Sequence, residues 1–300
     1  MRTLSQIETQ SIALLSSLYG DNEARSMVRM LLEEYCSITN RDYVLEPNKL
    51  VDTTLERSFE YVPRKDADLH ALSFDKAMDM CLSWRPIQYV MGHASFYDRE
   101  FYVREGVLIP RPETEELVQM IISESSDAKS IVDIGTGSGC IALSLKANIE
   151  KARVAAVDIS DKALEVVEIN RSLHGLDVEI LKLDILSEEL PHKYDVIVSN
   201  PPYVLDSERR AMRDNVLNFE PELALFVDDT TPLLFYNRIA QLATKHLNHG
   251  GKLYFEINER FATETVEMLE GLGFVDVVPC RDMFNKFRMV KALWQNTTNM

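Results

Sequence analysis

The sequence has no run rich in Lys or Arg, and the chain is acidic as a whole. Its 300 residues carry 32 Lys and Arg against 48 Asp and Glu, which gives a formal charge of −16 at pH 7. The first 85 residues hold −4 of this charge and the rest holds −12, so neither part is basic. Proteins bind phosphate backbones through clustered cations that displace condensed counterions. We therefore expect no direct contact with nucleic acid.

Cysteine and long apolar runs are also scarce. The four cysteines form no C-x-x-C pair and have no histidine at metal-ligand spacing; they are Cys36, Cys81, Cys140 and Cys280. This pattern predicts reduced thiols and no bound metal. The first residues, M-R-T-L-S-Q-I-E, lack the apolar core of a signal peptide, and no stretch approaches the ~18 apolar residues of a membrane span. We expect a cytoplasmic monomer with no membrane association.

Glycine is rare at the start of the chain, where residues 1–85 contain only Gly20. Apolar residues recur there at helical spacing, and further helical stretches follow Pro47 and span residues 66–84. A chain of this length has room for two domains. Residues 1–85 are therefore expected to form a small helical domain.

The composition of the sequence changes after Arg85. Aromatic and β-forming residues dominate up to Val103, with Gly92 and Asp98 as breaks, which predicts a β-hairpin linker over residues 86–107. From there on, short apolar strands alternate with helices. This alternation is typical of an α/β fold, a largely parallel sheet with helices on both faces, which we expect over residues 108–300.

A glycine-rich turn lies between the first strand and the first helix of this α/β region. It is the run Gly135, Thr136, Gly137, Ser138 and Gly139. Glycines allow a sharp turn and a close approach of the backbone to a ligand. The dinucleotide pattern G-x-G-x-x-G fails because position 140 is Cys, and no G-K-[ST] follows as in a P-loop. The G-x-G-x-G form resembles the loop that binds S-adenosylmethionine in class I methyltransferases, although a tight turn without a ligand remains an alternative.

Acidic residues end the next two predicted strands. Asp158 follows the second strand, and a carboxylate there can accept the two ribose hydroxyls of a nucleoside. Asp184 and Ile185 end the third strand, where the acid can accept from an adenine amino group and the apolar neighbour can cover the ring. The alternatives are a helix N-cap for Asp158 and a simple strand-end acid for Asp184.

The fourth strand ends in Asn200, Pro201, Pro202 and Tyr203. Two prolines cannot continue a sheet ladder, so the strand stops here and the turn is rigid. An amino group conjugated to a carbonyl or a ring is a poor nucleophile because its lone pair is delocalised. The Asn200 side-chain oxygen and the Pro201 carbonyl could accept its two N–H groups and direct the lone pair at a methyl group, while Tyr203 packs on the planar substrate. A rigid turn with a packed tyrosine is the alternative.

These stretches occur together with several others, and the combination resembles the protein N5-glutamine methyltransferase family (HemK/PrmC type). The matching segments are R-P-I-Q-Y-V-M-G-H-A-S-F-Y, I-P-R-P-E-T-E at residues 109–115, V-S-N-P-P-Y, F-E-P at residues 219–221 and Arg281-Asp282. Asn258 and the turn M-F-N-K depart from the family pattern. Both departures are expected to lie away from the site of methyl transfer.

The resemblance implies a Rossmann-like class I fold and transfer of a methyl group from S-adenosylmethionine to a glutamine side-chain amide. In the family this glutamine belongs to the Gly-Gly-Gln motif of class I peptide-chain release factors. It further implies that Asn200 and Pro201 hold the amide, that Asn200 also borders the cofactor and that the helical domain grips the substrate protein. Phe96 or Tyr97 and residues 110–115 are expected near the cofactor.

Three other functions remain open on the sequence. The same chemistry could act on a glutamine of a ribosomal protein. The tetrad N-P-P-Y is shared with adenine-N6 methyltransferases of nucleic acid, although the acidic charge weighs against them. A cofactor-binding scaffold without catalysis is the non-enzymatic alternative.

Overall fold

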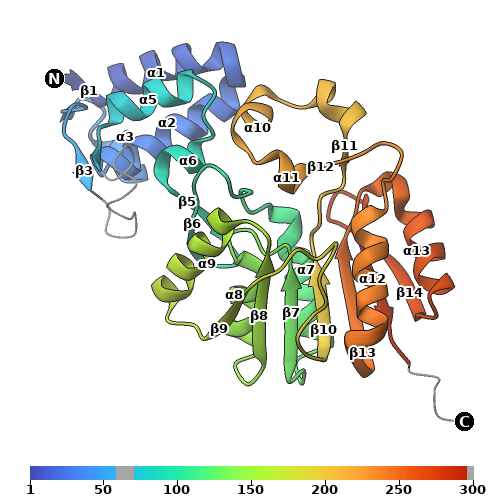
Figure 1. Ribbon diagram of the computed structural model, residues 1–300. Helices are drawn as coiled ribbons and strands as arrows, with labels where there is room; N and C mark the ends of the chain where they lie inside the picture. Colours follow the sequence, from blue (N-terminus) through green and yellow to red (C-terminus); the bar gives the residue numbers. More distant parts are fainter. Residues whose placement is uncertain (59–70, 296–300) are drawn as a thin grey trace, which may run out of the picture. The chain divides into compact units, whose positions relative to one another are not determined.

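The computed structural model describes residues 1–58 and 71–295, and it divides the chain into two compact units (Figure 1). The helical unit comprises Met1–His93 together with Arg213–Phe219, and the sheet unit comprises Ala94–Met212 together with Glu220–Met300. A short segment from the middle of the sequence thus belongs to the first unit. The role of the first 85 residues as a substrate-binding domain stays a prediction. Among the described residues, no helix is long and apolar enough to cross a membrane.

The helical unit is built around two amphipathic helices that pack against each other. They are α1 (Leu4–Tyr19) and α2 (Asp21–Cys36), and Gly20 between them has the φ of +79° that the sharp reversal requires. The other elements are α3 (Asn40–Leu45), α5 (Phe74–Leu82), α6 (Ile87–Met91), α10 (Asp214–Phe219) and the strand pairs β1 (Arg2–Thr3) with β2 (Leu50–Val51) and β3 (Arg57–Ser58) with β4 (Ala71–Leu72).

Two predictions for this part of the chain are wrong. No helix follows Pro47; the chain forms β2 there, because Leu50 pairs with Thr3 of β1 in an antiparallel ladder. The segment expected to be entirely a β-hairpin begins with α6, which Gly92 ends at a φ of +79°. The helix expected over residues 66–84 lies partly outside the described residues; within them, α5 agrees with it, whereas Ala71–Leu72 form strand β4.

The hairpin itself is confined to β5 (His93–Phe96) and β6 (Arg99–Tyr102). Tyr97 and Asp98 form its two-residue turn, and both have positive φ, of 48° and 58°. This geometry matches the type I′ turns that suit the twist of a hairpin.

The sheet unit contains a seven-stranded sheet in the order β14-β15-β13-β10-β7-β8-β9 (Figure 1). All neighbouring strands from β13 to β9 run parallel, and β15 is antiparallel to both of its neighbours. The strands are β7 (Ser130–Ile134), β8 (Arg153–Asp158), β9 (Val178–Lys182), β10 (Tyr194–Ser199), β13 (Leu247–Glu256), β14 (Val275–Arg281) and β15 (Phe287–Leu293). The predicted α/β fold is confirmed.

Helices cover both faces of this sheet because the strands are apolar on both sides. In β7, Ile131 packs into one buried cluster and Val132 into the other, as the two-residue repeat of a strand dictates. The first cluster holds residues of α7 (Pro112–Glu124), α8 (Cys140–Asn148) and α9 (Asp161–His174), and the second holds residues of α12 (Leu234–His246) and α13 (Ala262–Gly271).

Short elements fill the long connection between β10 and α12. They are β11 (Val204–Leu205), η1 (Asp206–Ala211), α11 (Glu222–Leu225) and β12 (Phe226–Val227), and β11 pairs with β12 in parallel. One further single turn, η2 (Glu259–Phe261), follows β13. The carboxyl ends of the parallel strands all lie at one edge of the sheet. This is the edge where open α/β folds bind ligands.

Candidate active site

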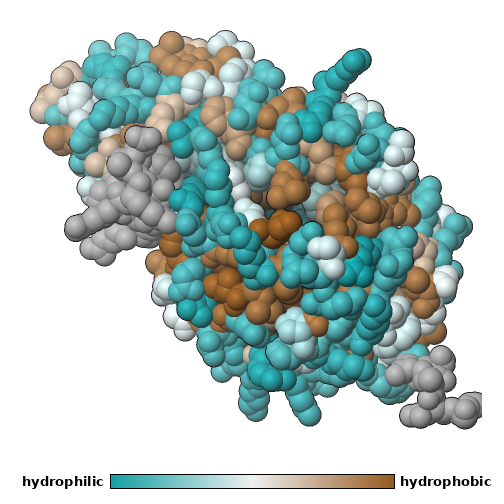
Figure 2. Space-filling model, viewed as in Figure 1, coloured by the Kyte–Doolittle hydropathy of each residue, from teal (hydrophilic) through white to brown (hydrophobic). Residues whose placement is uncertain are grey.

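A pocket lies at the carboxyl edge of β7, β8 and β10, within the sheet unit. Figure 2 shows apolar side chains gathered over this end of the strands. Most of the predicted site residues line the pocket, namely Gly135, Thr136, Gly137, Ser138, Asp158, Asp184, Ile185, Asn200, Pro201 and Pro202. Gly139 and Tyr203 are not among its lining residues. Ten of the twelve residues predicted for the site therefore line this one pocket.

The three glycines of the turn have different structural roles. All have positive φ, of 72°, 57° and 81° for Gly135, Gly137 and Gly139. A Cβ added at Gly135 or Gly137 would meet no atom within 4 Å, whereas one at Gly139 would lie 3.2 Å from Val167 Cγ1. The first two glycines keep the pocket side of the loop open, and the third allows α8 to pack against α9.

Asp133 holds this loop from beneath, and the sequence analysis assigned it no role. Its carboxylate is fully buried and accepts a hydrogen bond of 2.6 Å from Thr136 Oγ1. Burial raises the pKa of Asp133 to about 7, and the nearby Asp158 adds to the rise.

Asp158 is held by backbone N–H groups on both sides. Oδ2 accepts from Gly137 N at 2.9 Å, and Oδ1 accepts from Ser160 N at 2.9 Å. Burial raises its pKa, while these hydrogen bonds lower it. The cap of α9 is Ser160, whose hydroxyl accepts from Ala163 N, so Asp158 is not the N-cap. A carboxylate has further lone pairs beyond these two bonds, and they are available to a ligand in the pocket.

Asp184 organises the turn that follows β9 and also borders the pocket. Its Oδ1 accepts from Leu186 N at 3.0 Å and its Oδ2 from Ser187 Oγ at 2.8 Å. A turn follows this strand. The neighbouring Ile185 is fixed through its carbonyl, which accepts from Arg238 Nε of α12 at 2.9 Å. Asp184 can therefore hold the turn at the end of its strand and also accept a hydrogen bond from a ligand in the pocket.

Asn200 and Tyr203 lie on different sides of the N-P-P-Y turn. Asn200 borders the pocket, and its Nδ2 donates to Thr114 Oγ1 of α7 at 3.4 Å. Tyr203 instead donates its hydroxyl to Glu256 Oε1 at 3.0 Å, and burial raises the pKa of this phenol. The hydroxyl of Tyr203 is thus directed at a buried carboxylate, and the packing of its ring on a substrate stays a prediction.

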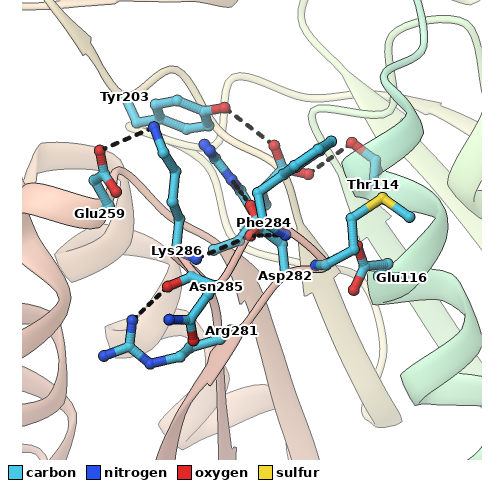
Figure 3. Close-up of polar contacts among 12 residues, drawn as sticks. Thr114, Glu116, Tyr203, Glu259, Arg281, Asp282, Phe284, Asn285 and Lys286 are labelled. Carbon is cyan, nitrogen blue, oxygen red and sulfur yellow. Dashed lines mark hydrogen bonds and ion pairs between the residues drawn. The ribbon is translucent and has the colours of Figure 1, made fainter.

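Glu256 is the residue of the site that the sequence analysis missed. It ends β13, is 1% exposed and accepts from Thr114 Oγ1 at 2.6 Å as well as from Tyr203 (Figure 3). Burial raises its pKa, and the charge of Arg288 opposes that rise. The signal was available, since Glu256 is a strand-end acid in the run K-L-Y-F-E-I, as Asp158 is in its own strand.

A second buried carboxylate joins two of the quoted motifs. Glu220 of F-E-P accepts from Arg111 Nη2 at 2.6 Å and from Ile109 N at 3.3 Å, and its side chain is 1% exposed. This pair fixes Arg111 at the wall of the pocket. The expectation for Phe96 and Tyr97 is wrong: Phe96 is in the core beside α7, and neither residue lines the pocket.

The two departures from the family pattern lie nearer the site than expected. Asn258 Nδ2 donates to the Tyr203 carbonyl at 3.1 Å, so this residue supports the N-P-P-Y turn directly. The turn after Asp282 is held by that aspartate, whose Oδ1 accepts from Phe284 N and Lys286 N (Figure 3). Met283 N of this turn donates to Glu116 of α7.

Other parts of the described chain offer less. A second cavity lies at the amino edge of the sheet, is bordered by several cationic side chains and contains none of the predicted site residues. Within residues 1–58 and 71–295, no cluster of His, Cys, Asp and Glu is arranged to hold a metal ion. The four cysteines are free thiols.

Comparisons with known proteins agree with this geometry. The methyltransferase small domain family matches residues 112–218. A release factor glutamine methyltransferase of Flavobacterium psychrophilum is 40% identical over 295 residues, which cover 96% of this chain and 98% of the relative. Another, from Bacteroides thetaiotaomicron, is 49% identical over 209 residues, covering 69% and 75%.

Among solved structures, a methyltransferase from Pyrococcus furiosus superposes with a TM-score of 0.51. The match covers 67% of this chain and 91% of that one at 17% identity. A likeness at this identity concerns the fold, and it agrees with the predicted Rossmann-like methyltransferase architecture.

Proposed function

Because the chain belongs to the family of release factor glutamine methyltransferases, we propose that it methylates the glutamine of the Gly-Gly-Gln motif in class I peptide-chain release factors. The methyl donor is S-adenosylmethionine, and the acceptor is the side-chain amide nitrogen. The observation that carries the proposal is that Asn200 and Pro201 border the same pocket as the glycine loop. A cytoplasmic location and a monomeric state stay predictions of the sequence.

The residues present suit S-adenosylmethionine. The pocket has apolar walls, its glycines leave space where a Cβ would project, and two carboxylates lie at the ends of neighbouring strands. Asp158 would accept from the ribose hydroxyls, and Asp184 with Ile185 would hold the adenine. The bound cofactor supplies a methyl group on a positively charged sulfur, which is activated for transfer.

The chain's own contribution is to position the substrate amide. The Asn200 side-chain oxygen and the Pro201 carbonyl would accept its two N–H groups, and the prolines hold these acceptors rigidly before substrate arrives. Held in this way, the amide nitrogen would receive the methyl group, and the donor would leave as its neutral thioether. The nitrogen becomes acidic as it gains charge and loses its proton to water.

The proposal is tested with labelled S-adenosylmethionine and three acceptors: a class I release factor, a mixture of ribosomal proteins and DNA. We expect label in the release factor alone, and none after its motif glutamine is replaced by alanine. Label only in ribosomal protein or only in DNA would replace the proposed substrate. Cofactor binding without transfer to any of the three would indicate a scaffold.

A further inference from the structure

A chain of hydrogen bonds runs from a buried carboxylate to the side-chain amide of Asn200. Thr114 Oγ1 donates to Glu256 Oε2 at 2.6 Å, and Asn200 Nδ2 lies 3.4 Å from the same Thr114 oxygen. Figure 3 shows Thr114 and Tyr203 directed at one carboxylate from opposite sides, and this carboxylate is Glu256. Asn200 follows β10 directly, Thr114 belongs to α7 and Glu256 ends β13, so this arrangement exists only in the folded sheet unit.

The polarity of this chain is set at Glu256. Glu256 accepts two hydrogen bonds, from the hydroxyls of Thr114 and Tyr203, and these bonds together with the charge of Arg288 favour the ionised form, which can only accept. A threonine hydroxyl has a single proton. Since that proton is used toward Glu256, the Thr114 oxygen can only accept from its other neighbour. The Asn200 amide must therefore present its NH₂ group, and not its oxygen, to Thr114.

We propose that Thr114 and Glu256 are positioning residues that select which end of the Asn200 amide faces the substrate. The two ends of an asparagine amide have nearly the same shape, so packing alone selects poorly between them. With NH₂ turned to Thr114, the oxygen is the end left for the substrate. The inference rests on the proposed function, because only an incoming NH₂ group needs an acceptor at this point. A reversed amide would set donor against donor.

The test is a pair of substitutions at Thr114, which is buried at 2% exposure. Thr114→Val keeps the shape and removes the hydroxyl, and Thr114→Ser keeps the hydroxyl and removes a methyl group. We expect T114V to lower kcat about 10-fold, the effect of one lost hydrogen bond of ordinary strength, and T114S to remain within about 2-fold of wild type. The KM for release factor and the affinity for S-adenosylhomocysteine should change less than about 2-fold in both variants.

The control is the same substitution at Thr265 in α13. This threonine is fully buried and its hydroxyl has no partner among the described residues, so T265V should leave kcat unchanged. A packing role for Thr114 predicts the opposite order, with serine worse than valine, and that order would overturn the proposal. Equal kcat in T114V and wild type would overturn it as well. If the wild-type enzyme does not methylate glutamine at all, the proposed function fails first, and this result is separate from either outcome.

A double-mutant cycle tests the role of Glu256. Glu256→Met removes the acceptor of the Thr114 proton, which frees the hydroxyl to donate to Asn200 and to reverse its amide. Both residues act through one chain of hydrogen bonds. The double variant T114V/E256M should therefore lose no more kcat than the single variant with the lower kcat. Independent, multiplying losses would show that the two residues do not act through Asn200. Unfolding temperatures of all variants identify any loss that comes from stability.

Discussion

Three carboxylates lie in or at the end of parallel strands of the sheet: Asp133 and Glu256 are buried, and Asp158 is partly buried. Burial raises the pKa of each, and each is held by short-range donors rather than by an exposed cation. Desolvation of this kind is common where a site must present acceptors in fixed directions. The desolvation of these carboxylates therefore costs free energy at the carboxyl edge of the sheet, close to the pocket.

We expect Asn200→Ala to lower the rate of methyl transfer by about 100-fold or more. The reason is the loss of one fixed acceptor for the substrate amide. The affinity of the N200A variant for the cofactor, measured by calorimetry, should stay within a few-fold of the wild-type affinity. The control is N148A, at the other end of α8 from the glycine loop, which should be active. An N200A enzyme with unchanged turnover would remove Asn200 from the mechanism.

The stability of the cofactor-free protein should depend on pH through Asp133. Its pKa is about 7 when folded, against about 3.9 in an unfolded chain, so between these values the folded state binds more protons. The contribution of Asp133 to stability is then greatest at low pH and is lost as pH rises through 7. We expect Asp133→Asn to remove this loss, so that its advantage over wild type grows by about 2 kcal/mol from pH 5 to pH 8.

Urea denaturation at several pH values measures this difference. The exposed Asp127 provides the control, since D127N should run parallel to wild type across the same range. Parallel curves for D133N as well would mean that Asp133 has the same pKa in both states.

Local patterns were enough to predict some site residues but not others. Asp158 and Asn200 could be found because each ends a strand beside a recognisable turn. Thr114 and Glu256 are 142 residues apart in the sequence, and nothing near either one predicts that they meet. The partner of the Tyr203 hydroxyl could not be predicted either, because Glu256 lies 53 residues further along the chain.

At the scale of elements, the glycine loop has two separable duties. Gly137 opens the pocket, and Gly139 permits close packing between helices. We expect Gly139→Ala to destabilise the protein by about 2–4 kcal/mol, from a strained φ and a close contact with Val167. Gly137→Ala should cost only about 1–2 kcal/mol, because no atom opposes the added Cβ.

We expect G137A to bind the cofactor more weakly than G139A, because the new Cβ of G137A projects toward the space for the ligand. Denaturant unfolding and calorimetric titration measure the two effects on the same samples. If G139A were the weaker binder and the more stable protein, the division of duties would be wrong.

Element boundaries were predicted well where local signals are strong. The glycine-rich turn lies between β7 and α8, as predicted, because its glycines mark the end of an apolar strand. The segment after Pro47 was assigned the wrong structure because its strand exists only through pairing with residues at the N-terminus. The start of the predicted linker was also wrong, since Ile87–Met91 is apolar enough to suit either a strand or a buried helix.

At the scale of the whole molecule, the charge of −16 predicts how the protein treats polyanions. We expect excess transfer RNA or DNA to leave release factor methylation unchanged at fixed ionic strength, because the overall field repels phosphate backbones. Turnover with and without competitor measures this. Inhibition that is relieved by added salt would contradict the prediction and direct attention to the cationic cavity at the amino edge.

The path of the chain between the units has a consequence for engineering. Arg213–Phe219 belongs to the helical unit, where Arg213 forms an ion pair with Glu23 at 2.9 Å, although its neighbours in sequence belong to the sheet unit. A chimera that replaces only residues 1–93 with those of a relative would therefore contain a mosaic helical unit, with its last helix from the wrong parent. If the helical unit binds the substrate protein as predicted, an exchange of substrate preference requires both pieces to be replaced together.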